Sequence, residues 1–189
     1  MNEPTMQDKY AFGFWIYLMT DLVMFAALFA AYAVLRNATF GEPSAGELFG
    51  LNNALAETLI LLTSSFTCGL AMLAVRAGKK TQVLALFTVT LFLGLAFLGL
   101  ELTEFSKLIA EGNGPQRSAA LSSFFTLVGA HGLHITFGLL WIVVALIQIK
   151  LRGLSEAIVS KVTRFGLFWH FLDIVWIFIF TIVYLLPHA

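Results

Sequence analysis

The sequence predicts an all-α polytopic membrane protein in which five transmembrane helices form one bundle. Of its 189 residues, 59% are hydrophobic and only 12% are charged, and the mean hydropathy is +0.89. A soluble domain does not need so much apolar surface to fill its core. The apolar residues gather in runs that are longer than the roughly 20 residues a helix needs to cross a bilayer. We predict spans at about 12–35, 52–76, 82–105, 120–150 and 164–186 of a single membrane domain, residues 1–189.

The placement of helix-breaking residues agrees with these spans. All four prolines fall in connections or termini, where a missing backbone donor does no harm: Pro4, Pro43, Pro115 and Pro187. The first span is expected to be retained and not cleaved as a signal peptide, because it carries Asp21 and no small-residue cleavage site follows it. The span at 120–150 would be about 45 Å long at 1.5 Å per residue, so it must tilt or project beyond the bilayer.

Lysine and arginine are unevenly divided between the two predicted sides of the membrane. Only Arg36, Lys107 and Arg117 fall on one side. The other side, which includes the N-terminus, carries the remaining eight basic residues: Lys9, Arg76, Lys79, Lys80, Lys150, Arg152, Lys161 and Arg164. Because positively charged loops stay in the cytoplasm, we predict a cytoplasmic N-terminus and a periplasmic C-terminus.

Ionisable side chains inside the spans are expected to have an interaction partner or a function. Inserting an aspartate at the middle of a membrane helix costs about 2.5 to 3.5 kcal/mol on insertion scales. Asp21, His170 and Asp173 lie about ten residues from the predicted cytoplasmic ends of spans one and five, so we predict that they form one polar cluster. Glu57 and Glu101 are expected at a different depth, near the outer (periplasmic) surface of the membrane. The candidate buried polar residues, all with structural roles, are Asp21, Glu57, Glu101, His131, His134, His170 and Asp173.

His131 and His134 stand with Gly138 at i, i+3 and i+7, on one helix face where a small residue permits close helix approach. Histidines three apart can share a metal, histidines from two helices could ligate a haem, and buried carboxylates could relay protons. The chain has only four histidines, however, and no span is broken at mid-depth. For His134, His170 and Asp173 we favour hydrogen bonding between helices, which fixes the register of the bundle.

Charge and motif content exclude several other classes of protein. The formal net charge is zero and no basic stripe is present, which argues against a nucleic-acid partner. The single cysteine, Cys68, excludes an intrachain disulfide and is most simply a small buried hydrophobe. Phosphate loops and nucleophile elbows are absent. We therefore predict no catalytic, cofactor-binding or metal-binding residue.

Four sequence motifs, in this order, resemble subunit III of the haem-copper terminal oxidases. They are FGFWIYLMTD at 12–21, ELTE at 101–104, HGLH at 131–134 and FWHFLDIVW at 168–176. The likeness covers essentially the whole chain, and the five spans resemble the shorter bacterial form of the subunit. Within the family, the chain is most similar to the cytochrome o ubiquinol oxidase branch. The additional pointers to that branch are GPQRS at 114–118 and FFTLVG at 124–129.

The resemblance implies an accessory subunit without redox centres, packed against a catalytic subunit I that carries haem and copper, together with subunits II and IV. The complex would be a proton-pumping enzyme of the bacterial inner membrane that oxidises ubiquinol and reduces dioxygen to water. The subunit would also bind phospholipid between its helices. By similarity, Asp21 is a buried carboxyl of unusual reactivity toward hydrophobic carbodiimides; most cytochrome c-oxidising relatives have glutamate there, which is one methylene longer.

Two alternatives stay open from the sequence alone. The first is subunit III of a cytochrome c oxidase, because the electron-donor site would lie on other subunits. The second is a membrane protein of another class that acts by itself, binding haem or translocating protons. Whether the chain alone is an enzyme is not decided by its residues.

Overall fold

The computed structural model describes residues 6–36, 38 and 50–186, and it confirms the all-helical class. Within those residues five helices are long and apolar enough to cross a membrane, and none of the described residues is in a strand. The helices are α1 (Met6–Leu35), α3 (Leu51–Arg76), α4 (Lys80–Ala110), α5 (Ala119–Arg152) and α6 (Glu156–Ile179), which continues as the π-helical segment η1 (Phe180–Leu185).

The helices extend beyond the spans predicted from hydropathy. Helix α4 continues past residue 105 to Ala110, and α6 begins at Glu156 instead of 164. Hydropathy marks only the part of a helix that lies in hydrocarbon, whereas backbone hydrogen bonding carries the helix on into polar sequence. At the start of α5 the Ser118 hydroxyl accepts a hydrogen bond of 3.1 Å from the Leu121 N–H, which caps the helix.

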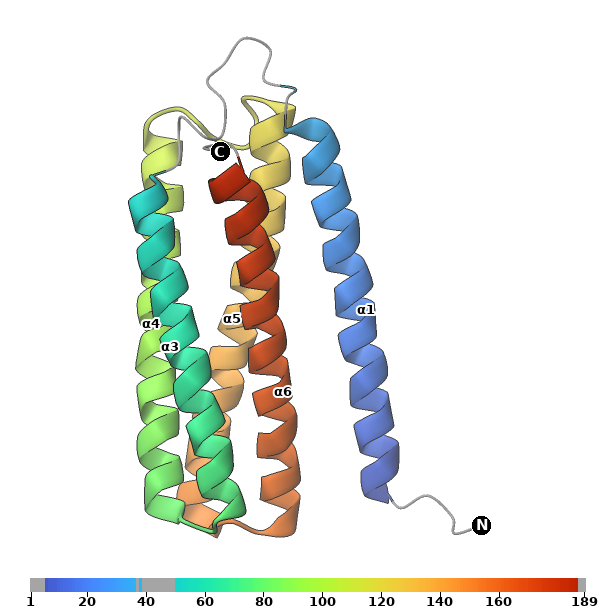
Figure 1. The fold of residues 1–189 in the computed structure, drawn as a ribbon, viewed down its shortest axis with the longest axis vertical. Coiled ribbons are helices and arrows are strands. Elements are labelled where there is room, and N and C mark those ends of the chain that lie inside the picture. Colours follow the sequence, from blue (N-terminus) through green and yellow to red (C-terminus); the bar gives the residue numbers. More distant parts are fainter. Residues whose placement is uncertain (1–5, 37, 39–49, 187–189) are drawn as a thin grey trace.

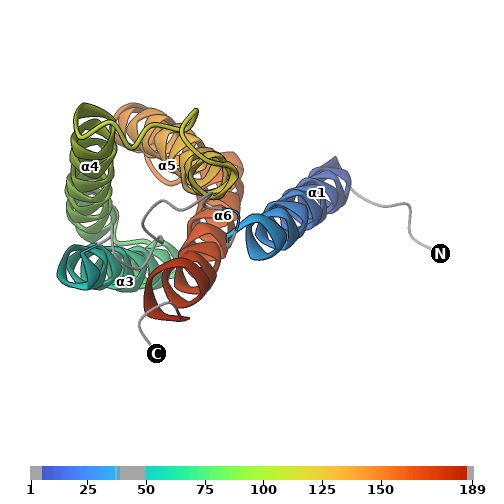
Figure 2. The ribbon, with the colours of Figure 1, turned by 90° about the horizontal axis from the view of Figure 1, so that it is seen from above.

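Helices α3, α4, α5 and α6 form a ring, and α1 lies outside it (Figure 2). Successive helices run in opposite directions, so α1 begins at one end of the bundle and η1 ends at the other (Figure 1). Helix α1 packs against α5 and α6, and much of its surface is exposed, with Trp15 at 51% and Val23 at 69%. The arrangement agrees with termini on opposite sides of a membrane. Which end faces the cytoplasm stays a prediction.

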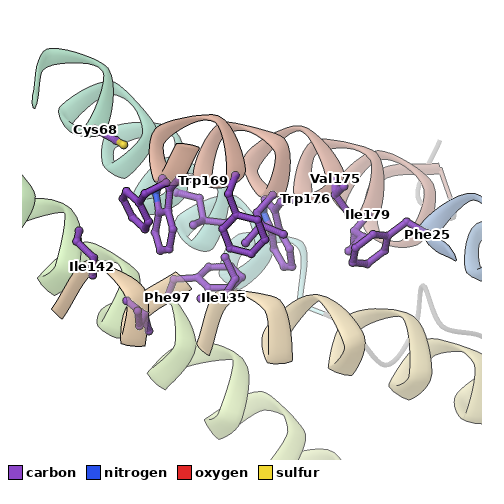
Figure 3. Close-up of a cluster of buried hydrophobic side chains, with 14 of the residues drawn as sticks. Phe25, Cys68, Phe97, Ile135, Ile142, Trp169, Val175, Trp176 and Ile179 are labelled. Carbon is purple, nitrogen blue, oxygen red and sulfur yellow. The ribbon is translucent and has the colours of Figure 1, made fainter. Parts of the chain in front are cut away.

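Large rings fill the interior of the four-helix ring (Figure 3). Trp169 and Trp176 of α6 are fully buried, and the Phe97 ring packs edge-on against Trp176 with centroids 4.7 Å apart. Two glycines make room for the other indole. A Cβ built on Gly94 of α4 would lie 2.9 Å from Trp169, and one built on Gly138 of α5 would lie 2.8 Å from it. The sequence predicts that Gly138 permits close approach of a neighbouring helix; what approaches it in the structure is the Trp169 side chain and not a helix backbone.

Short turns join the helices at the end of the bundle where α3 meets α4. Gly78 ends α3 with a φ of +68°, a left-handed conformation that glycine adopts without steric cost. The Lys79 N–H then returns to the Ala74 carbonyl at 3.0 Å. At the same end, the Lys80 ammonium donates a hydrogen bond of 3.1 Å to the carbonyl of Lys150 in the last turn of α5. This contact connects the start of α4 to the end of α5.

Candidate functional site

The Asp21 carboxyl faces His134 across the contact between α1 and α5. Its Oδ2 lies 3.7 Å from His134 Nε2, and the two side chains are 10% and 19% exposed. His134 Nδ1 donates a hydrogen bond of 2.7 Å to the carbonyl of Ala130, one turn earlier in α5. Since a carbonyl oxygen only accepts, Nδ1 carries hydrogen, and a neutral ring presents Nε2 to Asp21 as an acceptor. The Phe25 ring packs against His134 with centroids 5.2 Å apart.

His170 and Asp173 belong to a different cluster, on the side of α6 that meets α3. The Ser65 hydroxyl of α3 lies 2.7 Å from His170 Nδ1, and Asp173 interacts with both residues. The predicted single cluster of Asp21, His170 and Asp173 is therefore wrong. Helix α6 lies between α3 and α1, and it turns His170 and Asp173 toward α3 while it presents Phe168 and Phe171 to α1. Matched depth placed these residues correctly along the helices but not around them.

The two histidines of the HGLH motif contact different neighbours. His131 is fully buried in the ring interior, where Nε2 donates a hydrogen bond of 3.3 Å to the Leu172 carbonyl of α6. Its ring contacts those of Trp176 and Phe97, with centroids 5.2 and 5.8 Å away, and these two rings also contact each other. His134 instead points to α1. One histidine thus joins α5 to α6 inside the ring, and the other joins α5 to α1 outside it.

Glu57 and Glu101 are buried between α3, α4 and α5, with 1% and 3% of their surface exposed. Glu101 interacts electrostatically with Glu57 and Glu104. Its carboxyl packs against the backbone of α5 at Gly132, where an added Cβ would lie 2.8 Å from Oε1. A cavity of about 230 Å³ adjoins this group and is lined by Glu57, Glu104 and Lys107 among others. The two glutamates therefore form part of an acidic group inside the bundle, and Glu104 is a member that sequence reasoning did not single out.

Hydroxyl side chains are a second set that sequence reasoning missed. The indole N–H of Trp169 donates to Ser64 Oγ at 3.2 Å, and that of Trp176 donates to Thr58 Oγ1 at 3.1 Å. Serine and threonine are frequent in membrane helices and usually bond to their own backbone, as Thr58 also does to Ala54. Only the tertiary structure can therefore show which of them receive a tryptophan.

A pocket of about 480 Å³ lies where α1, α5 and α6 meet. Asp21 and His134 line it, and aromatic rings from all three helices make up most of the remaining wall. The full lining is Phe14, Tyr17, Asp21, Leu133, His134, Phe137, Trp141 and Phe168. Across the described residues, no group of three or more His, Cys, Asp and Glu side chains is placed to hold a metal ion.

Comparison with known proteins identifies the family. The family profile described as "Cytochrome c oxidase subunit III" matches residues 2–187. The chain belongs to this family. It is 58% identical over 175 residues to cytochrome bo(3) ubiquinol oxidase subunit 3 of Pseudomonas aeruginosa, covering 93% of this chain and 84% of that protein. It is 47% identical to quinol oxidase subunit 3 of Bacillus subtilis, over 92% and 85% of the two chains. It is also 44% identical to cytochrome c oxidase subunit 3 of Bacillus sp. strain PS3, over 98% and 90%.

Each of the four motifs that resemble the subunit III family supplies a polar side chain that contacts another helix in this structure. The motif at 12–21 supplies Asp21, and the motif at 101–104 supplies the carboxyl that packs on Gly132. HGLH contributes one histidine to each of two helix contacts. The motif at 168–176 contributes both buried indoles and the residue bonded to Ser65. In this subunit III fold the motifs therefore position the helices.

Proposed function

We propose that this chain is the accessory, non-redox subunit III of a bacterial proton-pumping quinol oxidase that oxidises ubiquinol and reduces dioxygen to water. The observation that carries the proposal is 58% identity, over 93% of the chain, to a subunit named for ubiquinol oxidation. A relative named for cytochrome c oxidation is 44% identical, which lies within the range of 42% to 58% for the relatives named for ubiquinol oxidation. Family membership supports a terminal oxidase, and the 58% and 52% identities to two ubiquinol oxidase subunits support the quinol branch.

The chain's contribution in this proposal is to stabilise the catalytic subunit. A role without redox centres is supported by the three histidines that the structure describes, because each is engaged within the chain: His131 bonds to Leu172, His134 to Ala130, and His170 lies against Ser65. Haem and copper are held by subunit I, subunits II and IV complete the complex, and electrons and pumped protons bypass this chain. No catalytic residue is assigned to it.

The surroundings of the subunit follow from its surface. Large apolar side chains face outward from α5, including Leu133 at 71% and Leu140 at 61% exposed, which suits hydrocarbon or partner helices and not water. We place the chain in the bacterial inner membrane with its N-terminus in the cytoplasm, and we expect bound phospholipid in its grooves. The excess of basic residues on one side supports that orientation.

A subunit III of a cytochrome c oxidase is the second candidate, because a relative with that name covers 98% of this chain. The two candidates share fold, partners and location, and they differ in the electron donor of the complex. The donor is therefore the property to measure.

The test is to purify the tagged chain from its native membrane in mild detergent. We expect co-purification of a haem- and copper-containing subunit and oxygen consumption with ubiquinol but not with reduced cytochrome c. Activity with cytochrome c alone would favour the second candidate. Isolation of the chain without such a subunit, or a Soret band in the chain by itself in a dithionite-reduced minus oxidised spectrum, would contradict the accessory role.

A further inference from the structure

The pocket between α1, α5 and α6 joins aromatic walls to a polar floor. Trp141 packs against both Phe14 and Phe168, with centroids 6.1 and 5.9 Å away, and Tyr17 lies 6.4 Å from Phe168. These flat surfaces from three helices line one volume of about 480 Å³. Aromatic walls of this kind pack well against another flat ring.

The floor of the pocket lies midway along the part of α1 that is long and apolar enough to cross a membrane. Asp21 stands 12 residues after Lys9 and 14 before Leu35, the ends of the membrane-spanning part of α1. At 1.5 Å per residue these separations correspond to about 18 and 21 Å, and the hydrocarbon core is only about 30 Å thick. Phospholipid headgroups and ester groups lie near the core boundary, so a lipid in its normal position would present only an acyl chain here.

An acyl chain cannot satisfy the polar atoms of this floor. Asp21 Oδ2 is buried and has no hydrogen-bond partner, and its separation of 3.7 Å from His134 Nε2 is too long for a direct bond. With Nδ1 donating to Ala130, a neutral His134 ring and an ionised carboxylate would be two acceptors facing each other. The Tyr17 hydroxyl of α1 hydrogen-bonds to the Asp21 carboxyl, but Oδ2 keeps no partner. A ligand hydroxyl between Oδ2 and His134 Nε2 would satisfy atoms that are costly to leave unpaired in hydrocarbon.

We propose that this pocket binds the ring of a membrane-soluble hydroquinone, with a phenolic hydroxyl donating to the floor at His134 Nε2 and Asp21. The ring packs against the aromatic wall that Trp141, Phe168 and Phe14 form, and an isoprenoid tail leaves past the exposed side chains of α5 into the bilayer. A hydroquinone supplies the flat ring, the donor and the solubility at mid-membrane that the pocket requires. The identity of the ligand rests on the proposed quinol oxidase function; the pocket and its polar floor do not.

The test uses the purified oxidase complex in phospholipid nanodiscs, photolabelled with a reduced short-chain azido-ubiquinone. We expect label in the peptides that contain Tyr17 of α1 or Leu133 to Trp141 of α5, and we expect excess unlabelled ubiquinol to suppress it. Leu133→Trp, which fills the pocket from the lipid side, should lower this label about tenfold. The matched control is Leu140→Trp, two turns along the same exposed face and outside the pocket lining, which should leave the label unchanged.

Three results would overturn the proposal: no label in these peptides, equal label in the Leu133→Trp and control complexes, or label that a photoactivatable phospholipid gives equally and ubiquinol does not displace. Loss of the label from an Asp21→Leu complex would show that the polar floor of the pocket contributes to binding, as the proposal requires. Failure of this pocket proposal can be told apart from failure of the proposed function. If the proposed function were wrong, the chain would not purify with a haem-containing, ubiquinol-oxidising partner at all.

Discussion

Adding one methyl group at Gly138 should loosen the packing of the bundle. In Gly138→Ala the new Cβ would lie 2.8 Å from Cζ3 and 3.0 Å from Cε3 of Trp169, and 3.3 Å from Phe168. Ordinary contacts of this kind are 3.4–4 Å. The indole cannot move away, because Gly94 already holds its opposite edge, with Cη2 2.9 Å from the position of an added Cβ. The indole N–H is also bonded to Ser64 at 3.2 Å.

The expected cost combines two effects of opposite sign. Overpacking a well-packed interior costs about 1 to 3 kcal/mol. Replacing glycine with alanine inside a helix returns about 0.5 to 1 kcal/mol of backbone entropy. We therefore expect Gly138→Ala to lower stability by up to about 2.5 kcal/mol. The measurement is the midpoint temperature at which the subunit leaves the purified complex, followed by size-exclusion chromatography after heating.

Two further variants test the cause of the loss. Gly99→Ala in α4 is the matched control, because no atom lies within 4 Å of its added Cβ, and it should not lower the midpoint. In a Trp169→Phe background, the smaller ring should remove most of the cost of Gly138→Ala. If Gly138→Ala and Gly99→Ala have the same midpoint, or if the loss is unchanged beside Trp169→Phe, the steric reasoning is refuted.

Three other predictions concern the interior contacts. Gly132→Ala should lower the same midpoint by about 1 kcal/mol, because its Cβ would meet the buried Glu101 carboxyl at 2.8 Å, and Glu101→Ala should remove that loss. Ser65→Ala should weaken retention of the subunit by about 0.6 kcal/mol, the average for hydrogen bonds between membrane helices, because His170 loses its 2.7 Å contact. Cys68 is 0% exposed and should resist N-ethylmaleimide in the intact complex and react after SDS unfolding, as mass spectrometry of the chain would show.

Each of these predictions has a control and a contradicting outcome. Thr63→Ala is the control for the serine variant, since Thr63 is exposed and bonds only to Leu59 in its own helix. Equal retention of both variants would mean that the contact between α3 and α6 contributes nothing measurable. If Gly132→Ala still lowers the midpoint when it is combined with Glu101→Ala, the loss does not come from contact with the Glu101 carboxyl. Rapid labelling of Cys68 in the folded complex would contradict the packing of α3.

The positions of the helices were readable from sequence because the bilayer acts on length and composition alone. A run of some 20 apolar residues crosses hydrocarbon regardless of its neighbours, and proline falls outside such runs. The same reasoning placed Glu101 and His131 among buried residues, since a polar side chain is rarely left in contact with lipid. It could not show that α6 starts at Glu156, because polar residues extend a helix without adding hydropathy.

The pairing of side chains needed the tertiary structure. Asp21 and His170 have similar depth, yet Asp21 meets His134 and His170 meets Ser65, because α6 lies between α1 and α3. Depth depends on position along one helix, whereas a partner depends on the rotation and order of several helices. Apolar residues distinguish these arrangements poorly in lipid, where one helix surface resembles another.

The sequence by itself determined that the chain is an all-helical membrane protein and that four motifs place it in the subunit III family. Those properties depend on local composition and on the order of residues. Only the tertiary structure decided that α1 lies outside a four-helix ring, that Trp169 lies against Gly94 and Gly138, and that Asp21 and His134 line one pocket between α1, α5 and α6. These features come from close packing and hydrogen bonding between helices, which are set by the shapes of facing surfaces and not by any one span.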